Sequence, residues 1–171
     1  VNIADLTQTL TINTGAQNNP DAFTQNQTTG TSNINLRGLG VGSTLVLLNG
    51  RRQVLTAATT NDGVSFVDTA SLVPLIAIDR VEILKDGASA LYGSDAVAGV
   101  ANFITRNGYE GILFSGDYTS HQSRGDYNEF NLQGLAGKQL GIVSLLAAVS
   151  YTERTPLTTE ERRLSVPAND T

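Results

Sequence analysis

The chain contains no cysteine among its 171 residues, which excludes disulfide bonds, thiol catalysis and thiolate metal sites. It also contains no methionine, so we expect it to be a processed or excerpted piece of a longer protein. Basic residues are few: 11 Lys and Arg against 16 Asp and Glu give a formal net charge of −5. This balance excludes nucleic acid as an expected partner, because a protein that binds phosphates needs a basic face. No run approaches the roughly 20 apolar residues that a membrane helix requires, and the first residues lack the pattern of a signal peptide.

Residues 1–31 are polar and rich in Asn and Gln, except for one apolar patch near the start. Within that patch the spacing of Ile3, Leu6 and Leu10 predicts one short amphipathic helix, opened by Asn2, with a loop after it. A low-complexity disordered tail is the alternative for this segment.

The strongest hairpin signal in the chain follows. Thr44–Leu48 is a short apolar run, and residues 51–55 are expected to return beside it. Between them lie Asn49 and Gly50, the dipeptide that best supplies two positive φ angles.

The glycines of residues 37–42 do not indicate a phosphate-binding loop. Such a loop follows a strand and opens a helix, whose N-terminal amides hold the phosphate. Here the glycines lead into a strand, so a turn that permits close approach of the backbone is the favoured interpretation.

Residues 80–84 alternate between charged and apolar side chains. We therefore expect a strand in which Val81 and Ile83 face a core while Arg80 and Glu82 face away from it.

The neighbouring segments are short and mixed in type. Residues 56–68 have the composition of an exposed loop, two short helices are predicted over 88–92 and 94–101, and a strand over 102–105. Strands and helices without regular alternation predict a small α+β unit.

After Arg106 the pattern changes to three strands, predicted over residues 112–119, 127–137 and 142–152. Each has one apolar and one mostly polar face, and each is near the length that crosses a bilayer when tilted. The connections alternate between tight and longer, and Tyr118 and Tyr151 fall at the rim with the longer loops, as in an aromatic girdle.

Alternation alone leaves two interpretations of these strands open. They form either the start of a transmembrane β-barrel or a soluble antiparallel meander with one face on a core. The two differ in whether the apolar face is left bare or is covered by protein.

Five sequence blocks, in order, resemble the plug domain of TonB-dependent outer-membrane receptors. Any one block is a weak signal, but five in the same order followed at once by barrel-type strands form a specific one. The blocks are residues 34–38, 45–51, 78–84, 87–94 and 98–105.

The resemblance implies a plug domain at residues 1–106 and the first three strands of an incomplete barrel at 107–171. It implies a Gram-negative outer-membrane transporter whose plug gates the barrel for energised import into the periplasm. The ligand would be a siderophore, vitamin, carbohydrate or peptide. The implied partners are the inner-membrane TonB complex, reached through a segment outside this chain, and membrane lipid. The residues after 106 are far too few for a barrel of about 22 strands.

The resemblance also suggests site residues. Arg37, Arg80 and Glu82 are candidates for a releasable lock between plug and barrel, because partly hydrated ion pairs are individually weak. Arg37, Asn61 and Asp62 are candidates for ligand contact, because binding residues concentrate on loops. The alternatives are a solvated strand face for Arg80 and Glu82, and a solvated loop tip for Asn61 and Asp62.

An enzyme is not expected, and neither is a metal or cofactor. His121, the single histidine, lies near Ser120 and Ser123, but a polar turn supplies no third group to fix a catalytic geometry. The acidic residues lack the spacing of a calcium loop. The rival to transport is a soluble periplasmic α+β binding module that ends in a three-stranded meander.

Overall fold

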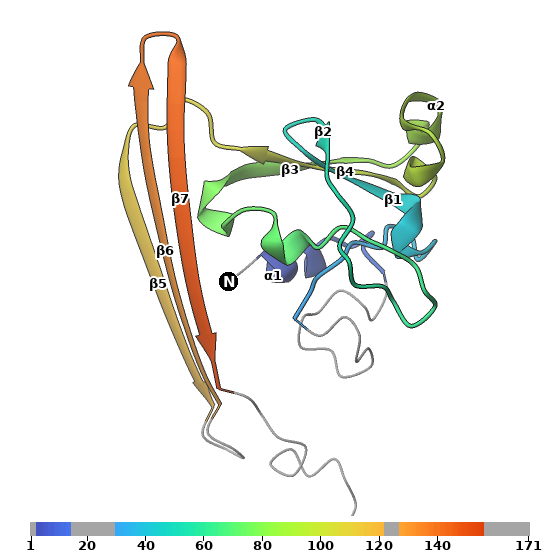
Figure 1. Ribbon diagram of the computed structural model, residues 1–171, viewed down its shortest axis with the longest axis horizontal. Coiled ribbons are helices and arrows are strands. Elements are labelled where there is room, and N and C mark those ends of the chain that lie inside the picture. Colours follow the sequence, from blue (N-terminus) through green and yellow to red (C-terminus); the bar gives the residue numbers. More distant parts are fainter. Residues whose placement is uncertain (1–2, 15–29, 122–126, 156–171) are drawn as a thin grey trace, which may run out of the picture.

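The computed structural model describes residues 3–14, 30–121 and 127–155, which form two sheets (Figure 1). A mixed sheet has the strand order β2-β1-β4-β3, and an antiparallel sheet has the order β5-β6-β7. We call the first sheet with its helices the mixed unit, and the second sheet the wall. In Figure 1 the wall stands at one end of the mixed unit. The predicted combination of an α+β unit with antiparallel strands is thus confirmed.

The mixed unit contains four strands and short helical segments. Its strands are β1 (Thr44–Leu48), β2 (Arg51–Arg52), β3 (Ile78–Leu84) and β4 (Gly99–Thr105). Its α-helices are α1 (Ile3–Gln8) and α2 (Ala88–Tyr92). Its 3-10 turns are η2 (Val41–Ser43), η3 (Thr69–Ser71), η4 (Leu75–Ala77) and η5 (Ser94–Ala96).

The centre of the mixed sheet is the parallel pair of β1 and β4. Thr44 lies opposite Gly99 and Leu48 opposite Phe103, while β2 and β3 pair antiparallel on the two outer sides. Side chains of alternate residues therefore leave the central strands toward opposite faces, and both faces are covered.

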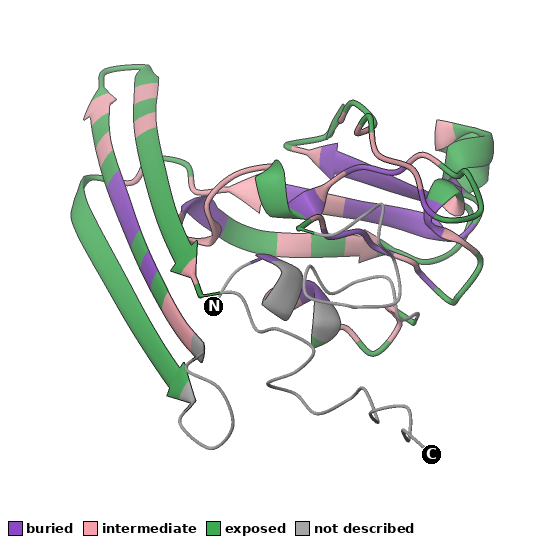
Figure 2. Cartoon of the chain, turned by 60° about the horizontal axis from the view of Figure 1, so that its bottom comes forward, coloured by how far each residue is buried: buried purple, intermediate pink, exposed green. Residues whose placement is uncertain are grey.

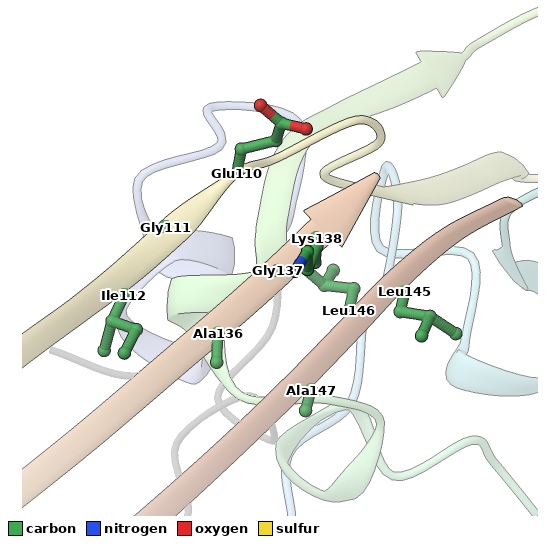
Figure 3. A pocket seen from close by; sticks show the side chains of 9 residues that line it. All are labelled: Glu110, Gly111, Ile112, Ala136, Gly137, Lys138, Leu145, Leu146 and Ala147. Carbon is green, nitrogen blue, oxygen red and sulfur yellow. The ribbon is translucent and has the colours of Figure 1, made fainter. Parts of the chain in front are cut away.

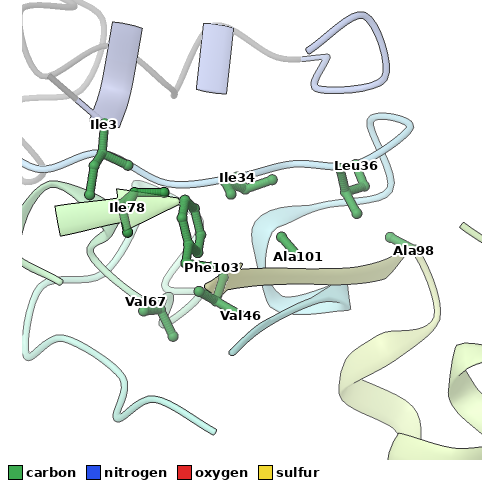
Figure 4. Packing of buried hydrophobic residues seen from close by; sticks show 9 residues of the cluster. All are labelled: Ile3, Ile34, Leu36, Val46, Val67, Ile78, Ala98, Ala101 and Phe103. Atoms are coloured by element: carbon green, nitrogen blue, oxygen red, sulfur yellow. The ribbon is translucent and has the colours of Figure 1, made fainter. Parts of the chain in front are cut away.

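The larger core lies on the face that carries Ala101 and Phe103, both fully buried (Figure 4). The extended segment before β1 contributes Ile34 and Leu36, and α1 contributes Ile3. On the opposite face a second cluster places Ala88 of α2 and Ala96 of η5 over the sheet, with these strand residues beneath: Leu45, Leu47 and Val100.

The hairpin prediction is confirmed in its turn but not in the length of its second strand. Asn49 and Gly50 have φ values of 50° and 76°, as the turn requires. However, β2 ends at Arg52 rather than at residue 55. The chain leaves the sheet there because the amide of Thr56 donates to the carbonyl of Phe66, a residue of the core.

The predicted helix over residues 94–101 is wrong beyond its first turn. Only η5 is helical, and β4 already begins at Gly99. The long-range pairing of this segment with β1 overrides its local helical signal, since Ala98 and Ala101 are both fully buried at that junction. The alternation prediction for β3 is confirmed: Val81 and Ile83 pack against the core, and Arg80 and Glu82 are exposed.

The wall consists of β5 (Gly111–His121), β6 (Tyr127–Leu140) and β7 (Val143–Arg154). The three predicted strands are confirmed, and each is longer than expected, with 11, 14 and 12 residues. The turn between β6 and β7 is limited to Gly141, with φ 61°, and Ile142. In the described ranges no helix is both long and apolar enough to span a bilayer.

Candidate functional site

The two faces of the wall differ in their surroundings. The outer face is apolar and exposed: Phe114 of β5 lies opposite Gly134 of β6, which lies opposite Val149 of β7, and both large side chains are more than 60% exposed. The inner face of β6 is buried where it meets the mixed unit, as Figure 2 shows for the middle of the strand. The buried inner side chains are Asn131, Gln133 and Leu135.

The outer face is continuous along the wall because the register aligns its apolar side chains. Contiguous apolar patches of this kind are uncommon on water-soluble domains. Its exposed large hydrophobic residues are Ile112, Phe114, Tyr118, Phe130, Leu132, Leu140, Val143, Leu145, Val149 and Tyr151.

Aromatic residues gather at the end of the wall away from the Gly141 turn. Tyr118 lies opposite Phe130, and Tyr151 lies opposite Leu132, one pair further along the same face. The hydroxyl of Tyr118 donates to Asn128 Oδ1 at 2.9 Å. The predicted position of the two tyrosines at the rim opposite the tight turn is therefore confirmed.

A groove of about 790 Å³ runs along the wall near the Gly141 turn (Figure 3). Its lining is mostly apolar, with Ile112, Ala136 and Ala147 further along it and Lys138 opposite Leu145 nearer the turn. It brings no nucleophile, base and acid together. Within the described ranges, no three His, Cys, Asp or Glu side chains are grouped so that they could hold a metal. His121 ends β5 opposite Tyr127, rather than lying in a turn as predicted.

Arg37 joins two segments of the mixed unit. Its φ is 59°, an uncommon value for a residue other than glycine. Its guanidinium donates to the carbonyl of Lys85 and to the carboxylate of Asp86. Both acceptors lie in the turn after β3, so Arg37 ties the glycine turn that precedes β1 to that turn.

Asn61 and Asp62 form the tip of a loop with a fixed base. Both are exposed. Below them Thr60 is buried, its amide donates to the carbonyl of Val64 at 3.0 Å, and its hydroxyl accepts from the Val64 amide at 3.1 Å. The prediction that all of residues 56–68 are exposed is wrong, because Thr60, Phe66 and Val67 are buried under the tip.

The loop lies against the glycine turn that follows Arg37. A Cβ added at Gly42 would come within 2.9 Å of Val64 Cγ1. The structure thus brings two candidate binding segments together, although Arg37 itself pairs with Asp86 rather than with Asp62.

Arg80 and Glu82 pair with each other on the exposed face of β3. Arg80 Nε donates to Glu82 Oε1 at 2.9 Å, and Arg80 also donates to Asp79 Oδ2 at 2.9 Å. Hydrogen bonds to Asp79 and then to Glu82 raise the pKa of Arg80 above its usual range, so the guanidinium stays charged at any physiological pH. Asn102 of β4 lies 3.5 Å from the second Glu82 oxygen.

The junction between the two sheets contains functional candidates that the sequence pattern did not identify. Gln133 Oε1 of β6 accepts from the Ile76 amide of η4 at 3.0 Å, and Arg106 Nε donates to the Ile76 carbonyl at 3.0 Å. Further along, the Gly108 amide donates to Ser144 Oγ of β7 at 3.1 Å. Alternation could place Gln133 on the inner face, but it could not name the partner of that side chain.

Comparison with known proteins gives a consistent set of similarities. A family model described as TonB-dependent Receptor Plug Domain matches residues 2–100. The chain is 42% identical over 76 residues to the iron-regulated outer membrane virulence protein in each of two strains of Vibrio cholerae serotype O1. That match covers 44% of this chain and 12% of either relative, so the chain spans a small part of their length.

The fold is similar to a crystal structure of the siderophore receptor PirA from Acinetobacter baumannii. The TM-score is 0.50 at 25% sequence identity, over 71% of this chain and 18% of that one. The structural match covers more of the chain than the family model does.

Proposed function

The chain belongs to the family of TonB-dependent receptor plug domains, and from this premise we propose that it is the plug and first wall strands of an outer-membrane transporter. In this proposal residues 1–106 form the plug and residues 107–171 begin the barrel. The family is one of receptors in the outer membrane of Gram-negative bacteria and not of enzymes, which agrees with the functional class expected from the sequence.

The observation that carries the proposal is the contrast between the two faces of the wall. Phe114 and Val149 project from an exposed apolar face, whereas Gln133 and Leu135 on the other side are buried near the mixed unit. A barrel strand presents its apolar side to lipid and its other side to the interior, where a plug would lie. The soluble-module alternative is disfavoured, because a soluble meander would cover its apolar face.

We propose an iron-chelating siderophore as the ligand class, in preference to a vitamin, carbohydrate or peptide. Support comes from the relatives, one described as iron-regulated and the other as a siderophore receptor. The proposed contact surface is the exposed tip at Asn61 and Asp62 together with the adjoining turn that begins at Arg37.

We further propose that the charges of the plug act as its releasable lock. Arg80 with Glu82, and Arg37 with Asp86, are exposed ion pairs. Such pairs contribute about 0–1 kcal/mol each, so they can be exchanged for pairs with further barrel strands and broken one at a time. The energy for release would come from the inner-membrane TonB complex, through a segment outside this chain.

Uptake by the intact receptor tests the function. The receptor would be expressed in a Gram-negative strain that lacks its own ferric-siderophore receptors, with and without a working TonB gene. We expect the receptor in the outer-membrane fraction and TonB-dependent uptake of radiolabelled iron from at least one of a set of catecholate and hydroxamate siderophores. Uptake of cobalamin or maltodextrin instead would contradict the ligand class, and recovery of the receptor in the soluble periplasmic fraction would contradict the function.

A further inference from the structure

The η4 turn, Leu75–Ala77, is hydrogen-bonded to two other parts of the molecule through the backbone amide and carbonyl of Ile76. It follows Pro74, and its own hydrogen bonds run from the Ala77 amide to the Pro74 carbonyl and from the Ile78 amide to the Leu75 carbonyl. The Ile76 amide has no hydrogen-bond acceptor within η4, because the first amides of a helical turn have none.

The missing acceptor comes from the wall. Gln133 Oε1 lies 3.0 Å from the Ile76 nitrogen, and the Gln133 residue is only 7% exposed. Gln133 is 57 residues away along the chain, so this bond connects the plug to β6 rather than stabilising a local turn.

The carbonyl of the same residue is held by the end of the plug. Arg106 Nε donates to the Ile76 carbonyl at 3.0 Å, and the Arg106 amide donates to the Ala77 carbonyl at 2.9 Å. Arg106 directly follows β4, which pairs with β3 from Ile78 onward. The turn is therefore fixed both to the sheet of the plug and to the wall.

The contact of η4 with the wall is made through β6. The inner side chains Ser115 and Asp117 of β5 and Ser150 and Thr152 of β7 are exposed, whereas Gln133 between them is buried. In the described part of the chain, η4 packs against β6 at this place. Because these neighbouring inner side chains are polar, release of the η4 contact would open space lined by hydrophilic groups.

We propose that Gln133, supported by Arg106, is the residue that anchors the plug to the barrel wall at η4, and that this anchor holds the gate closed. The proposal rests on the transport function proposed above and names a positioning residue within it. Gln133 acts through the backbone of Ile76 and does not need to touch the ligand.

Hydrogen exchange of the Ile76 amide in the intact, detergent-purified receptor tests the anchor. In the wild-type receptor this amide should be protected although η4 offers it no acceptor, and rapid exchange would overturn the proposal without any variant. Gln133→Met keeps the length of the side chain but removes the acceptor. We expect exchange at Ile76 to become roughly five- to tenfold faster, the effect of losing about one hydrogen bond.

Two further variants separate the anchor from general damage to the wall. Gln133→Glu keeps an acceptor oxygen and should keep the Ile76 amide protected. Gln139→Met makes the same substitution on the same inner face of β6, where the side chain donates only to the nearby Gly141 carbonyl, and should leave Ile76 unchanged. Equal exchange at Ile76 in Gln133→Met and the wild type would overturn the anchor.

Conductance in planar lipid bilayers tests the gate. The Gln133→Met receptor should open more often than the wild type and the Gln139→Met control. Faster exchange with unchanged conductance would overturn the gating role while leaving the contact in place. Hydrogen exchange and conductance need no ligand. They can therefore contradict the anchor while siderophore uptake is still observed, and an absence of siderophore uptake would leave their results unaffected.

Discussion

Gly137 of β6 lies directly against the backbone of Tyr109, so closely that a side chain at residue 137 would collide with the Tyr109 carbonyl. Tyr109 belongs to the short linker between β4 and β5, and Gly137 is on the inner face of the wall. The linker thus passes the inner face of the wall where a glycine of β6 offers bare backbone. This glycine is needed for close approach, since its φ lies outside the left-handed range.

Gly137→Ala should therefore destabilise the folded receptor by about 1–3 kcal/mol, the usual cost of forcing extra atoms into a packed site. The strain falls on backbone, which cannot rotate away as the end of a side chain can. Thermal unfolding in detergent measures the effect. Gly116→Ala on β5 is the matched control, because its new Cβ would have Leu132 Cδ1 as nearest neighbour at an ordinary 3.7 Å. Equal shifts in the two variants would show that the Tyr109 contact has no special role.

Glu82→Gln tests the proposed lock with little structural cost. Arg80 retains its hydrogen bond to Asp79, and exposed ion pairs contribute about 0–1 kcal/mol, so the stability of the receptor should change by less than about 1 kcal/mol. We expect uptake, or the force that unfolds the plug, to change nevertheless, because the charge that would meet the wall is gone. If uptake and unfolding force both match the wild type, Glu82 belongs only to a solvated strand face.

The local parts of this fold were predictable because short-range chemistry determines them. Asn49 and Gly50 specify their turn through backbone preferences alone, and the alternation around Val81 and Ile83 follows from the period of a strand. The outer and inner faces of the wall were predictable for the same reason.

The failures at β4, at β2 and between the two sheets involve residues that are distant in sequence. The start of β4 at Gly99 depends on pairing with Thr44. The end of β2 depends on the hydrogen bond from the Thr56 amide to the Phe66 carbonyl, which takes the chain out of the sheet. The bond from Ile76 to Gln133 joins two separate sheets. The periodicity of a single segment carries no information about which distant segment it will contact. Alternation therefore predicted which face of a strand each side chain occupies, but not the contacts between segments.

The candidate ligand contacts at Asn61 and Asp62 give a separate prediction. Both side chains lie at an exposed tip, while the buried Thr60 and Phe66 keep the loop in place, so truncation should affect binding and not folding. Asp62→Ala should weaken ferric-siderophore binding about tenfold, the effect of losing one hydrogen bond to a charged group, and Asn61→Ala by less.

Fluorescence titration of the purified receptor with a ferric siderophore, the proposed ligand class, measures these affinities. Asn107→Ala replaces an exposed amide in the linker, far along the chain from the tip, and should leave the affinity unchanged. Unchanged affinity in Asp62→Ala as well would mean that the tip is merely solvated.

Phe114 and Ser115 are neighbours in β5 that face opposite sides of the wall, and together they test the lipid-facing assignment. Phe114 lies on the exposed apolar face, opposite Gly134, and Ser115 lies on the inner face, opposite Gln133. If the outer face contacts hydrocarbon, an arginine there must be buried in lipid, at a cost of about 2–4 kcal/mol near the middle of the bilayer. Phe114→Arg should therefore lower the free energy of unfolding in lipid vesicles by that amount and reduce assembly into the outer membrane.

Ser115→Arg places the same charge one residue further along, toward a polar and hydrated interior, and should cost less than about 1 kcal/mol. A similar loss in both variants would mean that the two faces share one environment, which is incompatible with a wall that separates lipid from plug.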